Sequence, residues 1–481
     1  MNFSIVRFTT GRLLQIEAFL LLLPLLVSFI YREPMQYPLS FGAVILILLV
    51  IGQLTSRKMP RKTRITTKEG FVVVSLSWIL LSFFGALPFV FSGDIPSLID
   101  AFFETSSGFT TTGSSILTNV EALSHSMLFW RSFTHLIGGM GILVFALAVL
   151  PQFESESVYI MKAEVPGPTF GKLVSKLSST ARILYVIYLS MTLVVVILLL
   201  FGGMNLFDAL LHAFGVAGTG GFGIKNGGIA SYDSAYIQYV IAIGMLVFGV
   251  NFNLYYMILI KQVRQVFKSE ELKWYLGIVA SAVMLIGLNL LSSYDSLEKL
   301  FRDVLFSVSS VITTTGFSTA DFGKWPLFSQ IILLLLMFIG GSAGSTAGGL
   351  KVSRIVILFK TVMSEIKRVA QPNRVVSIRY DEKALSKETK HAVANYILIY
   401  AVIYIALLLL ISFDSPDFLT AFSSVAATFN NIGPGLGAVG PAESFAGLND
   451  FSKVILSFSM LAGRLEIFPM IILFSPRTWK K

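Results

Sequence analysis

Apolar runs of about 20 residues recur along the whole chain, and they limit its possible folds more than any other feature. As a helix, a run of that length crosses the hydrocarbon layer of a membrane, which is about 30 Å thick. Ten candidate spans follow this pattern: residues 13–31, 39–55, 71–92, 126–150, 183–202, 236–260, 272–291, 327–360, 392–412 and 452–474. The runs are continuous, whereas the strands of a transmembrane β-barrel alternate over about 10 residues. We therefore expect an all-α protein that crosses the membrane several times.

The composition excludes several other classes of protein. Only 13% of the 481 residues are charged, whereas soluble globular domains carry about 25%. The absence of cysteine excludes disulfides, thiolate nucleophiles and zinc–thiolate sites. The four histidines are scattered, and the chain contains no catalytic triad, phosphate-binding loop or dinucleotide fingerprint. We expect no enzymatic activity, no cofactor, and no metal other than a transported ion.

The basic residues indicate how the chain is oriented in the membrane. Of the 37 Lys and Arg, 29 lie near the termini or in four stretches between apolar runs, at 57–68, 162–182, 261–273 and 351–390. Cytoplasmic loops carry such an excess, so the net charge of +10 indicates topology rather than a nucleic-acid partner. Because both ends are basic, we expect both termini in the cytoplasm. The first apolar run lacks a small-residue cleavage site, which favours a retained helix over a signal peptide.

Four uncharged segments rich in Thr and Gly repeat at intervals of roughly 100 residues. Each follows about a dozen mostly apolar residues, too few to span, that open with helix-capping chemistry: Asp94 and Pro96, Asn205, Asp295 and Ser296, or Ser415 and Pro416. The segments read Thr110-Thr111-Thr112-Gly113, Gly218-Thr219-Gly220-Gly221, Thr313-Thr314-Thr315-Gly316 and Asn430-Asn431-Ile432-Gly433. The repeated unit is therefore a helix, a half-helix, an extended strand and a second helix.

This unit predicts five parts in the chain. Residues 1–68 form an N-terminal pair of transmembrane helices without an insert. Four pore repeats follow, at 69–160, 161–268, 269–386 and 387–481, and the third contains a glycine-rich intramembrane loop at 340–350. The expected fold is an all-α polytopic membrane protein. Its N-terminal pair and four repeats of helix, pore helix, filter strand and helix surround a pseudo-fourfold central pore.

The repeated segment is suited to line a pore. Irregular backbone at membrane depth occurs only where it is buried in protein or lines a water-filled cavity. Four such segments on one axis would present rings of carbonyls, which replace the hydration shell of a permeating cation. The half-helices would point their partially negative C-terminal ends toward the same site. The alternative is that Gly, Ser and Thr only mediate close helix packing, but four segments in register favour a pore for a monovalent cation.

These segments resemble the four pore loops of the TrkH/KtrB superfamily of bacterial potassium transporters. The similarity rests on residues 107–113, 218–222, 313–317 and 430–435, covers essentially the whole chain, and includes the N-terminal pair typical of the TrkH branch. It implies potassium uptake across the bacterial plasma (inner) membrane by a homodimer with one pore per protomer, gated by a cytosolic nucleotide-binding ring of the TrkA kind. It also implies a potassium-binding selectivity filter of Thr111, Thr112, Gly113, Thr219, Gly220, Gly221, Thr314, Thr315, Gly316, Asn431, Ile432 and Gly433.

Two of the segments depart from the Thr-Thr-Gly pattern. Gly220 replaces a threonine in the second segment, and the fourth reads Asn431-Ile432-Gly433. The ring is therefore not fourfold in its chemistry. We expect weaker discrimination of potassium over sodium than in a strictly fourfold filter.

A glycine-rich run at 340–349 interrupts the apolar span after the third segment. Each glycine costs a continuous helix roughly 1 kcal/mol relative to alanine, which favours a break over a seam of closely packed helices. TrkH-like proteins place an intramembrane gating loop here. We therefore predict a gate formed by Gly340, Gly341, Gly344, Ser345, Gly348, Gly349 and Lys351, the last of which could bar the path or reach the cytoplasm.

Arg464 lies within the last apolar run. A charge inside a span costs at least about 2.5 kcal/mol, so it normally faces a cavity or a partner. An ion pair with Glu466 is disfavoured because residues two apart on a helix point to different sides. We predict that Arg464 faces the permeation path below the filter and lowers cation occupancy; the alternative is a structural tie to carbonyls of the 340–349 loop.

Two functions from the transport class compete. The first is a passive, gated potassium pathway driven by the membrane potential, which supplies about 2.3 kcal/mol per charge per 100 mV. The second is a symporter that couples potassium to sodium or protons. The four repeats run in the same direction and few acidic residues lie in the spans, and both features favour the passive pathway.

Overall fold

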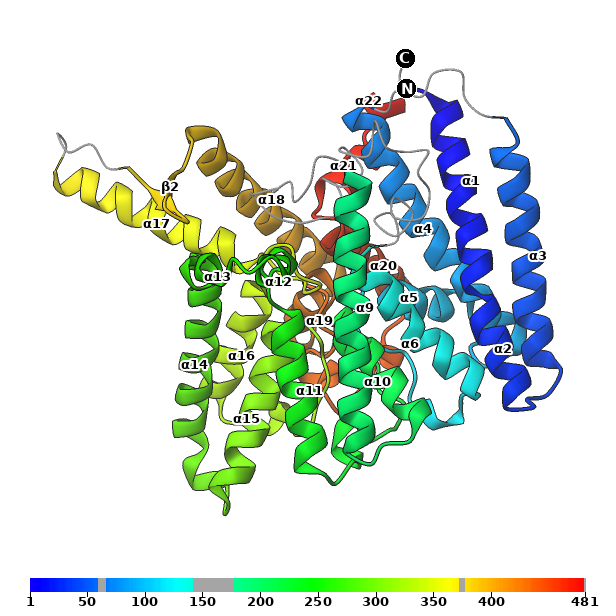
Figure 1. The fold of residues 1–481 in the computed structure, drawn as a ribbon, viewed down its shortest axis with the longest axis horizontal. Coiled ribbons are helices and arrows are strands. Elements are labelled where there is room, and N and C mark those ends of the chain that lie inside the picture. Colours follow the sequence, from blue (N-terminus) through cyan, green and yellow to red (C-terminus); the bar gives the residue numbers. More distant parts are fainter. Residues whose placement is uncertain (59–65, 142–176, 372–376, 480–481) are drawn as a thin grey trace.

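The computed structural model describes residues 1–58, 66–141, 177–371 and 377–479, and most of this part of the chain is helical (Figure 1). Six of its helices are long and apolar enough to cross a membrane, or seven if a bent pair counts as one span. The six are Phe3–Ile30, Gln36–Ser56, Thr67–Ser92, Thr180–Phe201, Glu270–Ser293 and Lys387–Ile411. The chain is a multi-pass membrane protein of α-helices, as the sequence predicts.

The N-terminal helices form a pair without an insert. Helix α1 (Phe3–Leu20) continues almost directly into α2 (Leu22–Ile30), and α3 (Gln36–Ser56) returns beside them (Figure 1). Glycines allow this close approach, because a Cβ at Gly52 would lie 2.9 Å from the carbonyl oxygen of Gly11. Small residues at an interface are the usual means by which membrane helices pack closely.

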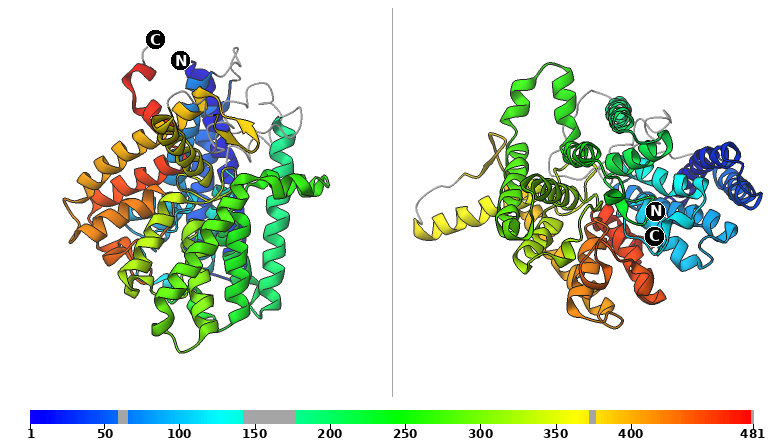
Figure 2. Two further views of the ribbon diagram at one scale, coloured as in Figure 1. Left: turned by 90° about the vertical axis from the view of Figure 1, so that its left-hand side faces the viewer. Right: turned by 90° about the horizontal axis from the view of Figure 1, so that it is seen from below.

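Each of the four following units contains a first helix, a half-helix and a second helix. The first helices are α4 (Thr67–Ser92), α9 (Leu177–Phe201), α14 (Glu270–Leu290) and α18 (Lys387–Ile411). The half-helices are α5 (Leu98–Phe109), α10 (Leu206–Gly218), α15 (Leu297–Ile312) and α19 (Phe418–Phe429). The second helices are α6 (His125–Gly139), α11 (Ala235–Phe248), α16 (Leu327–Ile339) and α20 (Asp450–Arg464). Seen from below, the units follow one another around the molecule in chain order (Figure 2, right).

Side-chain caps fix where the half-helices begin. The side chains of Ser97, Asn205, Ser296 and Asp417 each accept a hydrogen bond from the backbone N–H three residues on. Asn205 and Ser296 are among the predicted capping residues. In the first and fourth units the predicted positions are wrong, because the two prolines precede the cap instead of occupying the first helical position.

Three predicted spans are not continuous helices. The span at 236–260 bends by 91° between α11 and α12 (Phe252–Leu259). The span at 327–360 breaks between α16 and α17 (Val352–Ala370), and the one at 452–474 breaks between α20 and α21 (Phe468–Phe474). In the last two breaks the backbone takes positive φ, for example 71° at Gly340 and 70° at Ile467, which an α-helix does not accommodate.

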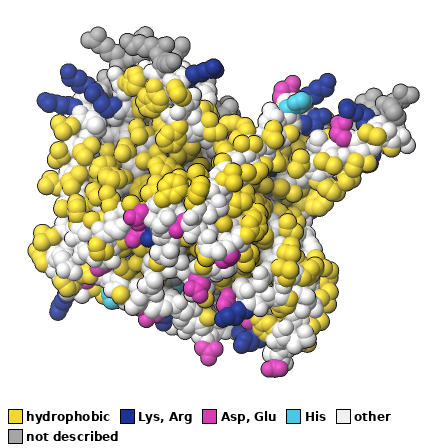
Figure 3. Space-filling view, turned by 180° about the vertical axis from the view of Figure 1, so that it is seen from behind, with side chains coloured by type: hydrophobic (Ala, Val, Ile, Leu, Met, Phe, Trp, Pro, Cys, Tyr) yellow, Lys and Arg dark blue, Asp and Glu magenta, His cyan; other side chains and the backbone are white. Residues whose placement is uncertain are grey.

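Helix α22 (Pro476–Trp479) lies at the end of the molecule that carries both termini (Figure 1). The other described elements are α13 (Val263–Lys268), a two-stranded antiparallel hairpin of β1 (Arg379–Tyr380) and β2 (Lys383–Ala384), and short 3-10 helices in the connecting segments. Helix α17 projects sideways with this hairpin as an arm. Hydrophobic side chains cover most of the flank, and Lys and Arg stand at the terminal end and on the arm (Figure 3). The second half of the predicted span 126–150, the unit boundary at 160/161 and residues 162–176 lie outside the described residues.

Candidate functional site

The four half-helices end in the same way. In each, the N–H of the residue before the last glycine donates to the carbonyl five residues back: Thr112 to Ser107 (2.8 Å), Gly220 to Gly215 (2.9 Å), Thr315 to Ser310 (2.8 Å) and Ile432 to Ala427 (2.8 Å). The residue before each of these donors has a left-handed backbone, with φ between 54° and 57° at Thr111, Thr219, Thr314 and Asn431. This bond pattern terminates many helices, but glycine normally supplies the left-handed residue. The segments therefore begin as tight helix ends, and the backbone that continues from them, at 112–117, 220–223, 315–318 and 432–435, is not helical.

The four terminal glycines close a ring. A Cβ at Gly113 would overlap the carbonyl oxygen of Gly220, one at Gly221 that of Thr315, and one at Gly316 that of Ile432. The ring closes because a Cβ at Gly433 would lie 3.0 Å from the carbonyl oxygen of Thr112. Each glycine thus faces the carbonyl that precedes the glycine of the next segment. All four glycines also have positive φ, from 72° to 106°, which disfavours a side chain at each of them. At Gly113, Gly221 and Gly316 the neighbouring carbonyl leaves no space for one either.

The structure brings all twelve predicted filter residues into this ring of four segments. Thr111, Thr219, Thr314 and Asn431 are each at most 1% exposed. Hydroxyl pairs support two of the segments, since Thr110 Oγ1 lies 2.7 Å from Thr112 Oγ1 and Thr313 Oγ1 lies 2.8 Å from Thr315 Oγ1. Asn431 Nδ2 donates to Thr112 Oγ1 at 2.9 Å, which joins the fourth segment to the first.

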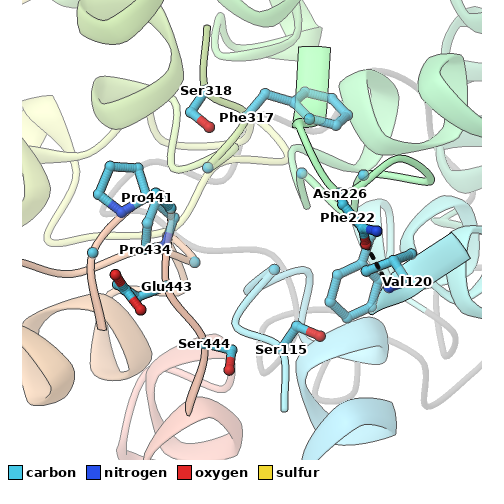
Figure 4. Close-up of a pocket in the computed structure, with 18 of the residues that line it drawn as sticks. Ser115, Val120, Phe222, Asn226, Phe317, Ser318, Pro434, Pro441, Glu443 and Ser444 are labelled. Carbon is cyan, nitrogen blue, oxygen red and sulfur yellow. Dashed lines mark hydrogen bonds between the residues drawn. The ribbon is translucent and has the colours of Figure 1, made fainter. Parts of the chain in front are cut away.

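A cavity of about 440 Å³ opens on one side of the ring. Gly113, Gly221, Gly316 and Gly433 all line it, together with the residues that follow each of them. Figure 4 shows the surrounding side chains converging from the four units, with Ser115, Phe222, Phe317 and Pro434 next to the ring. A hydrogen bond of 2.8 Å from the Val120 N–H to Asn226 Oδ1 connects the first two units at the rim (Figure 4). The rim also carries the carboxylates of Asp321 and Glu443.

The glycine-rich loop contacts two segments of the ring, at residues that precede the terminal glycines. The Gly348 N–H donates to Thr314 Oγ1 at 2.6 Å, and the Gly349 N–H donates to the carbonyl of Asn430 at 3.1 Å. Further along the loop, the Ser342 N–H donates to the Gly249 carbonyl at 3.0 Å, at the end of α11. The loop therefore touches two of the four segments and is held in place by hydrogen bonds, whereas glycine content alone suggests a loose connection.

The two predicted charged residues near the loop are both tied to carbonyls. Lys351 is 3% exposed and donates to the carbonyl of Ala347. Arg464 donates to the carbonyls of Thr346 at 2.7 Å and of Gly138 and Gly139 at 2.6 Å each. The guanidinium thus joins α20, α6 and the loop, which is the structural tie that the sequence left as the alternative.

A buried ion pair braces the first half-helix. Arg131 Nε lies 2.6 Å from Glu104 Oε1, and both side chains are at most 3% exposed. Arg131 also donates to the Gly223 carbonyl at 2.8 Å and covers the ring of Phe222 at 3.5 Å. No local pattern in the sequence links these two charges, because 27 positions separate them. No group of three or more His, Asp and Glu in the described residues is placed to hold a metal ion.

The fold and the ring define a class of protein: a polytopic helical membrane protein with re-entrant half-helices around a narrow site lined by backbone. A family model for TrkH, described as a cation transport protein, matches residues 39–481. Over the full length of both chains, this protein is 38% identical to the Trk system potassium uptake proteins TrkH of Salmonella typhimurium and of Escherichia coli K12. The crystal structure of the potassium transporter TrkH from Vibrio parahaemolyticus matches with a TM-score of 0.89 over 100% of both chains, at 34% identity.

The chain belongs to the TrkH family of cation transport proteins. Members of this family are transporters and not enzymes, as the sequence predicts. This chain is also 32% identical, over the full length of both chains, to the Trk system potassium uptake protein TrkG of Escherichia coli K12.

Proposed function

We propose that this protein takes up potassium across the bacterial plasma membrane through a selectivity filter formed by the four-segment ring. The main observation behind the proposal is that the contacts between the four segments close into a ring, because each terminal glycine faces a carbonyl of the next segment. The twelve residues that the sequence predicts for the filter are the ones that make up this ring. The relatives at 38% identity bear the name potassium uptake protein.

The chemistry of the ring suits a weakly held monovalent cation. Thr, Gly, Asn and Ile side chains carry no charge, so backbone carbonyls are the ligands that the ring offers, and carbonyl rings replace the hydration shell of potassium in filters. Four half-helices end at the ring, and the partially negative C-terminal end of a helix favours a cation. An inside-negative potential then drives uptake without a coupled ion.

The loop 340–350 with Lys351 is the proposed gate. It follows a broken helix, and hydrogen bonds hold it against the third and fourth segments of the ring. With the loop in this position the pathway below the ring is closed. Opening requires breaking its bonds to Thr314, Asn430 and Arg464, and conduction therefore depends on a conformational change.

The assembly that we propose follows from the family and the surface. A homodimer with one pore per protomer carries a cytosolic nucleotide-binding ring of the TrkA kind, and both termini lie in the cytoplasm. Lys and Arg stand without neighbouring Asp or Glu at the terminal end, whereas basic and acidic side chains are mixed at the opposite end (Figure 3), and this difference supports that orientation. The functional parts are the N-terminal pair at 1–68 and the pore repeats at 69–160, 161–268, 269–386 and 387–481.

The test is rubidium uptake into proteoliposomes of purified protein under an imposed inside-negative potential, with potassium and sodium as competitors. Gly316→Ala is the test variant, because its Cβ would overlap the Ile432 carbonyl. Gly287→Ala on α14 is the matched control, since its Cβ meets no atom within 4 Å. Uptake blocked by potassium, spared by sodium, lost in Gly316→Ala and kept in Gly287→Ala supports the proposal. Uptake that requires a sodium or proton gradient contradicts it and favours the symporter.

A further inference from the structure

The second segment of the ring lacks the side chains that support the first and third. In those two, the threonine before the terminal glycine shares a hydroxyl contact with the threonine two residues earlier, in the pairs Thr110–Thr112 and Thr313–Thr315. The equivalent positions in the second segment are Gly218 and Gly220. Glycine at both places would leave a gap behind the Gly220 carbonyl unless another part of the chain fills it.

His135 of α6 fills this gap. A Cβ at Gly220 would lie 2.5 Å from His135 Nδ1 and 2.6 Å from Cδ2, so the imidazole occupies the space of a residue-220 side chain. A Cβ at Gly218 would instead overlap the backbone carbonyl of His135 and lie 2.7 Å from its carbonyl carbon. The imidazole thus takes the place of a side chain at position 220, and the backbone carbonyl of His135 takes the place of one at position 218. In the other three segments the corresponding side chains belong to the segment itself.

The imidazole is held by packing. His135 is 0% exposed, and its ring stacks on that of Phe222 with a centroid distance of 4.2 Å. Neither ring nitrogen has a hydrogen-bond partner among the described residues. Arg131, one helical turn earlier, covers the same Phe222 ring. Shape rather than hydrogen bonding therefore accounts for the position of the imidazole against Gly220.

We propose that His135 is the positioning residue of the second segment, which holds the Gly220 carbonyl in the ring and thereby sets the discrimination between potassium and sodium. The inference rests on the proposed function. Gly220 O is the oxygen that Gly113 faces, so a shift of this carbonyl changes the contact between the first two segments. A carbonyl that is free to move accommodates the smaller sodium ion, since filter selectivity depends on the field strength and flexibility of the carbonyls.

Adding side-chain volume at position 220 and removing it at position 135 tests this role. Gly220→Ala should lower rubidium uptake at least tenfold, because its Cβ would overlap the His135 imidazole and displace the segment. His135→Ala should keep uptake and make sodium at least threefold more effective as a competitor. The combination of Gly220→Ala with His135→Ala should restore uptake to within threefold of His135→Ala alone. His135→Val is a second, bulkier partner for the same rescue if the alanine variant does not fold.

Gly218→Ala is the matched control. Its Cβ collides with the His135 backbone, which no side-chain change at position 135 removes, so neither His135→Ala nor His135→Val should rescue it. His135→Phe should retain wild-type competition by sodium, because an aromatic ring of similar shape replaces a ring whose nitrogens make no hydrogen bond. Size-exclusion profiles verify that each variant is folded.

The outcomes separate this inference from the proposed function. Wild-type protein that takes up no rubidium contradicts the proposed function. Wild-type uptake together with no rescue of Gly220→Ala, or with equal rescue of Gly218→Ala, overturns the role of His135 alone. Unchanged sodium competition in His135→Ala also overturns it.

Discussion

Arg354 and Glu466 lie 112 positions apart in the chain and form a two-pronged ion pair, with Nη1 to Oε1 at 3.0 Å and Nη2 to Oε2 at 2.5 Å. Arg354 is in the first turn of α17, directly after the glycine-rich loop, and Glu466 lies in the break between α20 and α21. Arg354 also stacks over Tyr396 at 4.1 Å. The pair joins two of the three helix breaks and fixes the far end of the loop.

Removing this pair should make the closed loop less stable. Glu466→Gln leaves the Arg354 charge without its partner, which costs about 1–3 kcal/mol for a hydrogen bond to a charged group. We expect higher rubidium uptake in the absence of any regulatory partner. The exposed pair Arg368–Glu365 supplies the control, since Glu365→Gln should change uptake by less than about twofold. Equal uptake in Glu466→Gln and wild type would contradict a role for the pair in closure.

Glu271 should contribute to closure in a related way. Its Oε1 accepts from the N–H of Ala343 at 2.7 Å and from the N–H of Ser353 at 3.2 Å, so one oxygen holds both flanks of the loop. Glu271→Ala should raise unregulated uptake, whereas Glu271→Gln, which keeps an acceptor oxygen, should lie between the alanine variant and wild type. Flux measurements in proteoliposomes at equal protein density test this order; a glutamine variant as leaky as alanine would refute it.

Arg464 should limit flux through its bonds to the loop. Arg464→Ala removes the donors to the Thr346, Gly138 and Gly139 carbonyls and a positive charge below the ring, so we expect faster rubidium uptake. Arg464→Lys keeps the charge but cannot reproduce the planar fork. If the tie to carbonyls dominates, the lysine variant is fast like alanine; if charge dominates, it is slow like wild type. Either way, an alanine variant with unchanged flux would contradict both roles.

Two buried glutamates should respond differently to the same substitution. Glu17 is 0% exposed and its carboxyl has no hydrogen-bond partner among the described residues, whereas Glu104 pairs with Arg131. Glutamine has nearly the same shape as glutamate and removes no hydrogen bond that the described residues make to Glu17. Glu17→Gln should leave the melting temperature within about 2 °C of wild type. Glu104→Gln should lower it clearly, because breaking a buried pair costs about 3–5 kcal/mol.

Thermal unfolding in detergent, monitored by size-exclusion chromatography, measures the melting temperature of both glutamate variants. A large loss of stability in Glu17→Gln would show that the carboxylate has a partner, for example an ordered water. A stable Glu104→Gln would show that Arg131 is satisfied by the Gly223 carbonyl and the Phe222 ring alone.

Patterns of single elements could be predicted from the sequence, and contacts between distant elements could not. Hydropathy predicts the membrane class and the long spans, and the capping residues Asn205 and Ser296 follow from local chemistry. The left-handed backbone at Thr111 and Asn431 is missed, because glycine normally marks that position in a helix end. The bend before Asn251 is missed for a different reason. The sequence has no proline and no cluster of glycines at the bend, and Gly249 is the single glycine next to it.

The candidate site shows the same division. Repetition of the Thr/Gly segments identifies the residues of the ring, although whether they bind potassium stays a prediction. The glycine-rich run indicates a broken helix, and α16 and α17 are separated there. Its anchors, Thr314, Asn430 and Glu271, come from elements far away in the chain. Their roles depend on which helices become neighbours, which local sequence does not encode.

The closed order of the ring has a consequence for how such a chain can change over generations. Each junction is built from a glycine of one segment and a backbone carbonyl of the next, so the glycine is restricted, whereas the residue that supplies the carbonyl varies among Thr112, Gly220, Thr315 and Ile432. The four segments can therefore differ in the residues before the terminal glycine, as the second and fourth do. They cannot differ at the terminal glycine itself, through which neighbouring segments meet. Randomised libraries of this protein should keep the four terminal glycines and vary the positions before them together with the side chains behind them, for example position 220 with position 135.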